Sequence, residues 1–159
     1  MRTDRVRAEP RTDRSERKDY MEYKKFGSTY MVRIDCGEEI LQSLKQVCEQ
    51  EGIRLAQVSA IGATDHAVVG VYDLEEKKYH EEKLDGFMEI TGLSGSVTEM
   101  NGRPYIHLHA TLADQENRIH GGHAISLRVG ATCEMFVRAL DGKVVREKNE
   151  ALGINLWTF

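Results

Sequence analysis

Residues 105–112 alternate between polar and apolar side chains. Successive side chains of a β-strand point to opposite faces, so this alternation predicts a half-buried strand. One face holds Tyr105, His107, His109 and Thr111, and the other holds Ile106, Leu108, Ala110 and Leu112. We expect the apolar face to pack on the core, which leaves both histidines on a polar face.

Short apolar runs separated by turn residues predict further strands along most of the chain. We expect these strands at residues 29–34, 56–61, 67–72, 87–90, 93–100, 125–129 and 133–139. Residues 152–159 predict a last strand that closes the core or forms an interface. Asn101-Gly102 predicts a two-residue hairpin, and Asp141-Gly142 predicts a similar turn before a strand at residues 143–145.

One segment has a clear helical period. Its apolar residues recur every three or four positions, and Asp35 and Glu38 before them have the spacing of a capping box. Gly52 follows as a stop signal. We therefore predict a helix over about residues 37–51. A single helix among many mostly antiparallel strands predicts the α+β fold class.

Length and composition predict one domain. The 159 residues include 40% hydrophobic side chains, enough to fill one core, and residues 1–19 form a polar tail before a domain at 20–159. No apolar run has the length of a membrane span or of a signal peptide core, so we expect a cytoplasmic protein without membrane association. Cys36, Cys48 and Cys133 lack metal-type spacing, which is typical of buried or semi-buried thiols in a reducing compartment.

The charge distribution argues against tight DNA binding. Residues 1–19 hold seven basic and five acidic side chains, so the rest of the chain holds 15 basic and 21 acidic ones and carries a net charge of −6. Proteins that bind the phosphate backbone need clustered Lys and Arg. The tail contains the only basic segment, and its interleaved acids weaken it as a nucleic-acid arm.

Four of the six histidines (His107, His109, His120 and His123) lie within 17 residues. His107 and His109 share a strand face, and His123 follows Gly121-Gly122, a pair that lets the backbone bend and return. Neutral imidazole is a common metal ligand, and three histidines with an open position are typical of catalytic zinc. We therefore predict a zinc site formed by His107, His109 and His123, although another divalent metal is also compatible.

Residues 87–123 carry a more specific pattern. An aromatic residue precedes a Glu-Ile pair, and a Leu-Ser-Gly sequence, a Gly-x-Pro turn and two histidine groups follow. In this chain they are Phe87-Met88-Glu89-Ile90, Leu93-Ser94-Gly95, Gly102-Arg103-Pro104, His107-Leu108-His109 and Gly121-Gly122-His123. The pattern resembles the plant-and-prokaryote-conserved (PPC) domain, also called DUF296, and the similarity covers about residues 23–158.

This resemblance implies an α+β domain with a curved mixed, mostly antiparallel sheet and one main helix, assembled as a homotrimer. In the prokaryotic single-domain members the three histidines are regarded as a metal site, and they correspond to His107, His109 and His123. Plant members bind DNA through a separate AT-hook. Residues 101–104 lack the first arginine of that hook and fall in a predicted turn, so we do not interpret them as one.

Glu89 is the candidate catalytic residue. It lies between apolar neighbours in a predicted strand, so its carboxylate must face the polar side or find a partner. It would orient an imidazole or act as a general base beside a metal-bound water, and the alternative is an ordinary exposed residue. Glu134 has the same two interpretations. We expect His120 at the rim of the site, and His66 and His80 on the surface.

Three functions remain open from the sequence. The first is a homotrimeric metal-binding domain without an assigned activity. The second is a metal-dependent hydrolase or lyase that acts on a small molecule, so the sequence does not decide whether the protein is an enzyme. The third is a DNA-associated or transcription-adaptor module with a protein partner.

Overall fold

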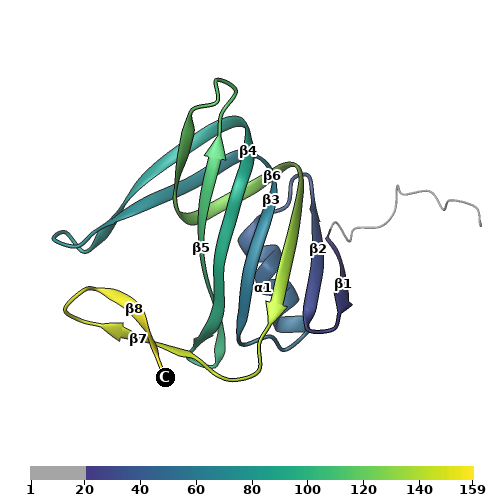
Figure 1. Ribbon diagram of the computed structural model, residues 1–159. Helices are drawn as coiled ribbons and strands as arrows, with labels where there is room; N and C mark the ends of the chain where they lie inside the picture. Colours follow the sequence, from purple (N-terminus) through teal and green to yellow (C-terminus); the bar gives the residue numbers. More distant parts are fainter. Residues whose placement is uncertain (1–20) are drawn as a thin grey trace, which may run out of the picture.

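Eight strands and one helix make up residues 21–159, the part of the chain that this computed structural model describes (Figure 1). The strands are β1 (Glu22–Phe26), β2 (Thr29–Asp35), β3 (Ala56–Asp73), β4 (Lys78–Met100), β5 (Arg103–Ala113), β6 (Ile119–Ala139), β7 (Val145–Asn149) and β8 (Ile154–Thr158), and the helix is α1 (Ile40–Gln50). The α+β class with one helix is confirmed. The predicted tail at residues 1–19 lies outside the described residues.

The strands form one curved sheet, in the order β1-β2-β6-β3-β4-β7-β8. Strand β5 pairs with both β4 and β6, so the pairings of β3, β4, β5 and β6 close a circuit at one end of the molecule. Every pairing between strands is antiparallel except a single parallel pair between β4 and β7. The expected mixed, mostly antiparallel sheet is thus confirmed, and Figure 1 shows α1 behind it.

The helix begins later than its sequence pattern predicts. Its N-cap is Glu39, whose carboxylate accepts hydrogen bonds from the backbone N–H of Gln42 and of Leu127 in β6. Glu38 accepts from the backbone N–H of Asp35, as a capping box requires, but this contact shapes the turn before the helix. The predicted start at residue 37 is therefore wrong, because Glu39 both caps the helix and ties it to the sheet.

Buried apolar residues fill the space between α1 and the sheet. The helix contributes one buried stripe, and Leu108, Ala110 and Leu112 of β5 are buried opposite the exposed His109, as their alternation predicts. Cys48 and Cys133 lie in this core, where burial raises the pKa of both thiols to about 12. Cys36 is exposed, which corrects the expectation that all three thiols are at least half-buried.

Several predicted strands are parts of longer ones. The runs at 56–61 and 67–72 both belong to β3, and those at 87–90 and 93–100 both belong to β4. Register shifts near Gly62 and Gly92 absorb the interruptions without ending the strands. The runs at 125–129 and 133–139 likewise belong to β6. Strand β1 was not predicted, because four of its five residues are exposed and show no apolar alternation.

The C-terminal residues form a separate hairpin of β7 and β8. Asp141-Gly142 connects β6 to β7, which do not pair with each other, so the predicted hairpin turn and strand at residues 143–145 are wrong. In Figure 1 the yellow hairpin stands beside the extended arm of β3 and β4. Tyr72 and Lys77 of that arm donate hydrogen bonds to the backbone carbonyls of Leu152 and Glu150 in the β7–β8 turn.

Gly95 explains why the Leu-Ser-Gly sequence lies beside the His107 strand. A Cβ at this position would overlap the carbonyl oxygen of His107, so β4 and β5 can pair closely only if residue 95 has no side chain. Gly92 lies three residues earlier on the same strand and has nothing within 4 Å of an added Cβ. The backbone of Gly95 thus sets the position of β5.

We expect Gly95→Ala to destabilise the protein by several kcal/mol, about 2–5, or to prevent folding, because the new methyl group must displace backbone atoms. Gly92→Ala is the matched control and should change the free energy of unfolding by less than about 1 kcal/mol. Urea denaturation followed by circular dichroism measures both. Equal stabilities of the two variants would contradict this role of Gly95.

Candidate metal centre

Three histidine side chains converge on one face of the sheet, as their sequence positions predict. His109 of β5 is paired with His123 of β6, and His107 lies two residues before His109 on the same face. The ring centroids are 5.2 Å apart for His107 and His109, 5.1 Å for His107 and His123, and 5.5 Å for His109 and His123. One nitrogen from each ring lies within 4.8 Å of the others, a spacing that allows one ion to contact all three.

Gly121 and Gly122 place His123 by a different route from the one expected. They do not form a bend that returns the chain, because both lie inside β6. A Cβ on Gly121 would overlap the carbonyl oxygen of Ala110 in β5, and one on Gly122 would lie 2.7 Å from the carbonyl oxygen of Gly70 in β3. The two glycines therefore let β6 lie tightly between its neighbours.

The protonation states of the histidines fit metal binding. Burial, reinforced by the nearby charge of Arg146, lowers the pKa of His107 to about 4. Burial also lowers the pKa of His123, so both rings are neutral near pH 7 and each has one unprotonated nitrogen. Nδ1 of His123 is buried and has no hydrogen-bond partner among the described residues. A metal ion would satisfy this nitrogen, so the donor set fits a cation that prefers imidazole.

Arg146 of β7 is the functional residue that sequence reasoning missed. Arg146 is only 8% exposed. Its Nη2 donates a hydrogen bond to Nδ1 of His107 at 3.1 Å. Nε donates to Oγ1 of Thr98 at 2.9 Å, and Nη1 donates to the carbonyl oxygen of Asn155 at 2.8 Å. The sequence pattern around Arg146 does not predict that it belongs to the site, because β7 reaches the site only through the tertiary fold.

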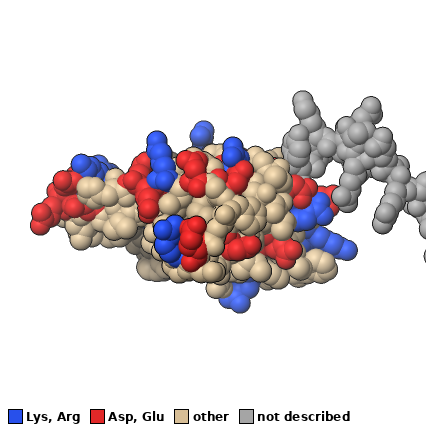
Figure 2. Space-filling model, turned by 90° about the horizontal axis from the view of Figure 1, so that it is seen from above, with Lys and Arg blue, Asp and Glu red and all other residues tan. Residues whose placement is uncertain are grey.

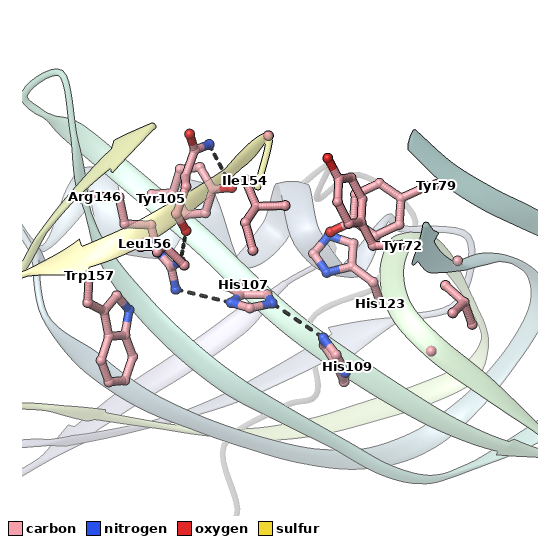
Figure 3. A pocket seen from close by; sticks show the side chains of 15 residues that line it. Tyr72, Tyr79, Tyr105, His107, His109, His123, Arg146, Ile154, Leu156 and Trp157 are labelled. Carbon is pink, nitrogen blue, oxygen red and sulfur yellow. Dashed lines mark hydrogen bonds between the residues drawn. The ribbon is translucent and has the colours of Figure 1, made fainter. Parts of the chain in front are cut away.

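The histidines lie at one side of a cavity of about 850 Å³ between the sheet and the β7–β8 hairpin (Figure 3). Tyr79 stacks on His123 with ring centroids 4.7 Å apart, and Tyr72 packs edge-on against Tyr79. Ile154, Leu156 and Trp157 of the hairpin complete the wall. The cavity is therefore mainly aromatic and apolar, with polar groups gathered at the histidines and Arg146.

Glu89 lies away from this arrangement. It is an exposed residue of β4, paired with Ala63 and Ala113, and it is not among the residues that line the cavity. No carboxylate of residues 21–159 forms a hydrogen bond or ion pair with His107, His109 or His123, so Arg146 is the charged group in contact with the cluster. A catalytic role of Glu89 stays a prediction.

The other histidines have separate partners. His120 is half-buried beside Asp114 at 3.1 Å, and Asp114 also accepts backbone hydrogen bonds in its own turn. His66 pairs with Asp85 at 2.6 Å. His80 forms an exposed group with Asp73 and Glu76 near the tip of the β3–β4 arm, outside the cavity. None of these three joins the central cluster.

A family comparison matches the resemblance seen in the sequence. The profile of the Plants and Prokaryotes Conserved (PCC) domain matches residues 21–141. The chain belongs to this family. The PCC match includes all three histidines but ends before β7, so the hairpin that supplies Arg146 and Trp157 lies beyond the matched residues.

Two solved structures of similar proteins support the fold. A proposed DNA-binding protein of Bacteroides thetaiotaomicron is 29% identical, with a TM-score of 0.86 over 89% of this chain and 99% of that chain. A metal-containing protein of Archaeoglobus fulgidus is 35% identical, with a TM-score of 0.79 over 87% of this chain and 98% of that chain. This chain thus shares its fold with both proteins.

A curated relative carries a similar segment within a longer chain. The bifunctional protein GlmU of a Synechococcus strain is 32% identical over 130 residues, which is 78% of this chain. The same residues are 19% of GlmU, so this chain spans about a fifth of that relative's length. The likeness therefore concerns one part of GlmU.

Proposed function

We propose that this PCC domain is a metal-binding protein in which His107, His109 and His123 hold one zinc ion. The convergence of three imidazoles beside a cavity carries the proposal. His109 is exposed and the other two are half-buried, so the cluster is reachable from solvent. The metal-containing relative of Archaeoglobus fulgidus supports the same conclusion.

The chemistry of the donors favours zinc. Three nitrogen ligands without a fourth protein ligand leave a position for water or a ligand, which is the arrangement of catalytic zinc sites. Such an ion would supply Lewis acidity and lower the pKa of a bound water. Stacking on Tyr79 holds the ring of His123, and cross-strand pairing holds His109 against it, so the donors are positioned before the ion binds.

We expect untagged protein to contain about one zinc per chain by elemental analysis. His109→Ala and His123→Ala should each weaken zinc binding by more than about 100-fold, because removing a ligand costs more than removing an outer contact. His66→Ala is the control, since His66 pairs with Asp85 outside the cluster. Zinc content that survives both ligand variants, or falls equally in the control, would contradict the proposed site.

The proposed assembly is a homotrimer. Family resemblance suggested it, and an exposed apolar patch on the sheet supports it: Met31 of β2 is paired with Phe136 of β6, and they are 46% and 48% exposed. Ile61 of the adjacent β3 is 58% exposed. Burying such a patch between copies is favourable, and a closed ring leaves no copy with an uncovered patch.

We expect light scattering at micromolar concentration to give three times the mass of one chain. Phe136→Asp should shift the mass towards the monomer, because a carboxylate would be buried in the interface. Leu74→Asp is the control, at another exposed apolar residue near the tip of the β3–β4 arm. A monomeric mass for the unaltered protein would refute the trimer.

Tight DNA binding is not part of the proposed function, although a similar protein is a proposed DNA-binding protein. Figure 2 shows Lys and Arg interspersed with Asp and Glu over the face that it presents. Several cations of residues 21–159 form ion pairs, as Arg128 does with Asp65 at 2.7 Å and Lys143 with Glu99 at 2.8 Å. The domain thus interleaves its cations with a larger number of acids, whereas phosphate binding needs clustered Lys and Arg.

We expect a random duplex of about 25 base pairs to bind no more tightly than nonspecific complexes, with a Kd of about 10⁻⁴–10⁻⁶ M at about 150 mM salt. Fluorescence anisotropy of the labelled duplex measures it. Nanomolar binding that disappears when residues 1–19 are deleted would assign DNA binding to that segment. Nanomolar binding that survives the deletion would overturn our interpretation of the acidic domain.

A second candidate is a metal-dependent hydrolase or lyase that acts on a small molecule. The cavity beside the histidines favours it, because a ligand there would reach the open metal position. Glu89 stays the candidate general base in this alternative. Because Glu89 is not among the residues that line the cavity, it would have to act on a cavity of a neighbouring copy.

A further inference from the structure

Arg146 is a buried cation without a carboxylate partner. The residue is 8% exposed, and no acidic side chain of residues 21–159 forms an ion pair with it. Burial lowers the pKa of Arg146, which reflects the cost of holding this charge away from water. Buried charges in proteins are normally paired, so the cavity lacks an anion.

The guanidinium is held in place with donors to spare. Its carbon lies 4.8 Å from the ring centroid of Tyr105 and 5.7 Å from that of Trp157, so the group is placed between two aromatic side chains. A guanidinium has five N–H bonds, and the contacts to Thr98, Asn155 and His107 use three of them. One N–H on each terminal nitrogen remains without a partner among the described residues.

Metal binding by His107 would release the N–H of Arg146 that this ring now accepts. Arg146 always donates, so Nδ1 of His107 must accept, and the neutral ring carries its proton on Nε2, 3.3 Å from Nε2 of His109. If Nε2 of His107 instead binds a metal, its proton lies on Nδ1, where Arg146 can no longer donate. The cavity would then hold a metal ion and a guanidinium with no anion to balance them.

We propose that the cavity binds a small organic carboxylate, whose oxygens accept hydrogen bonds from Arg146 beside the three histidines. This inference rests on the proposed metal function, because ligand and metal share one cavity. A carboxylate matches a single arginine, since a phosphate dianion usually has several cationic or backbone donors. The lining contains no lysine or acidic residue, and its aromatic and apolar side chains fit an apolar ligand body.

The β7–β8 hairpin determines this specificity. It supplies Arg146, and Ile154, Leu156 and Trp157 on the same hairpin form the wall beside it (Figure 3). The matched PCC domain ends at residue 141, so the ligand-recognising part of the cavity lies outside the segment that defines the family. The histidines and the carboxylate anchor thus come from different parts of the chain.

The single tryptophan of the chain reports on the cavity directly, because Trp157 contacts the guanidinium. We would titrate zinc-loaded full-length protein with acetate, isobutyrate and phenylacetate, and with the corresponding uncharged amides, and follow Trp157 emission and heat. At least one acid should bind about tenfold more tightly than its amide, as a charge-assisted hydrogen bond requires. If no acid is preferred over its amide, the inference is wrong.

Arg146→Gln should abolish the preference for the acid, whereas Arg103→Gln, at an exposed arginine of β5, should leave it unchanged. If Arg146→Gln does not fold, Arg146→Lys is the second variant. Lysine keeps the charge but cannot form two parallel hydrogen bonds with a carboxylate, so acid binding should weaken about 3–10-fold. An unchanged preference in a folded Arg146 variant assigns Arg146 a purely structural role and overturns the inference.

Zinc content, measured on the same samples, separates this inference from the proposed function. A preference for the acid in protein that takes up no zinc would support the Arg146 anchor and contradict the metal site. Full zinc loading without any preference for the acid would support the metal site and contradict the anchor.

Discussion

Backbone pairing of β5 with β6 is the constraint on which the chemistry of this protein depends. It sets His109 beside His123, and the strand period of two adds His107 on the same face. Gly95 and Gly121 have no side chains at the points where carbonyl oxygens of β5 press against their backbones. The glycines thus determine the spacing of the strands, and that spacing brings the imidazole nitrogens within reach of one ion.

The sequence predicted the parts of the fold that are local. The alternation of polar and apolar residues correctly predicted that His107 and His109 share a strand face, and the helical period predicted α1. Both patterns reflect burial of one face of a single element. Element boundaries were less predictable. The β3 and β4 strands continue through bulges at glycines that resemble breaks in the sequence, and Glu39 caps the helix only because β6 lies beside it.

The candidate site also has a part that the sequence predicts and a part that only the tertiary fold determines. The histidine cluster follows from residues close in sequence, and the family resemblance pointed to the same three residues. Arg146 is 39 residues from His107, and its neighbours in β7 give no sign that it will be buried. Its position depends on how the hairpin packs against the sheet, through Thr98 and the arm that carries Tyr72. Such tertiary contacts are not encoded in any local period.

X-ray absorption at the zinc edge of the loaded protein tests the central claim most directly, because it measures the atoms around the ion. We predict three imidazole nitrogens at about 2.0–2.1 Å and one further light atom from water or a ligand. A shell containing sulfur at about 2.3 Å would place zinc at a cysteine such as the exposed Cys36, and that result would contradict the three-histidine site.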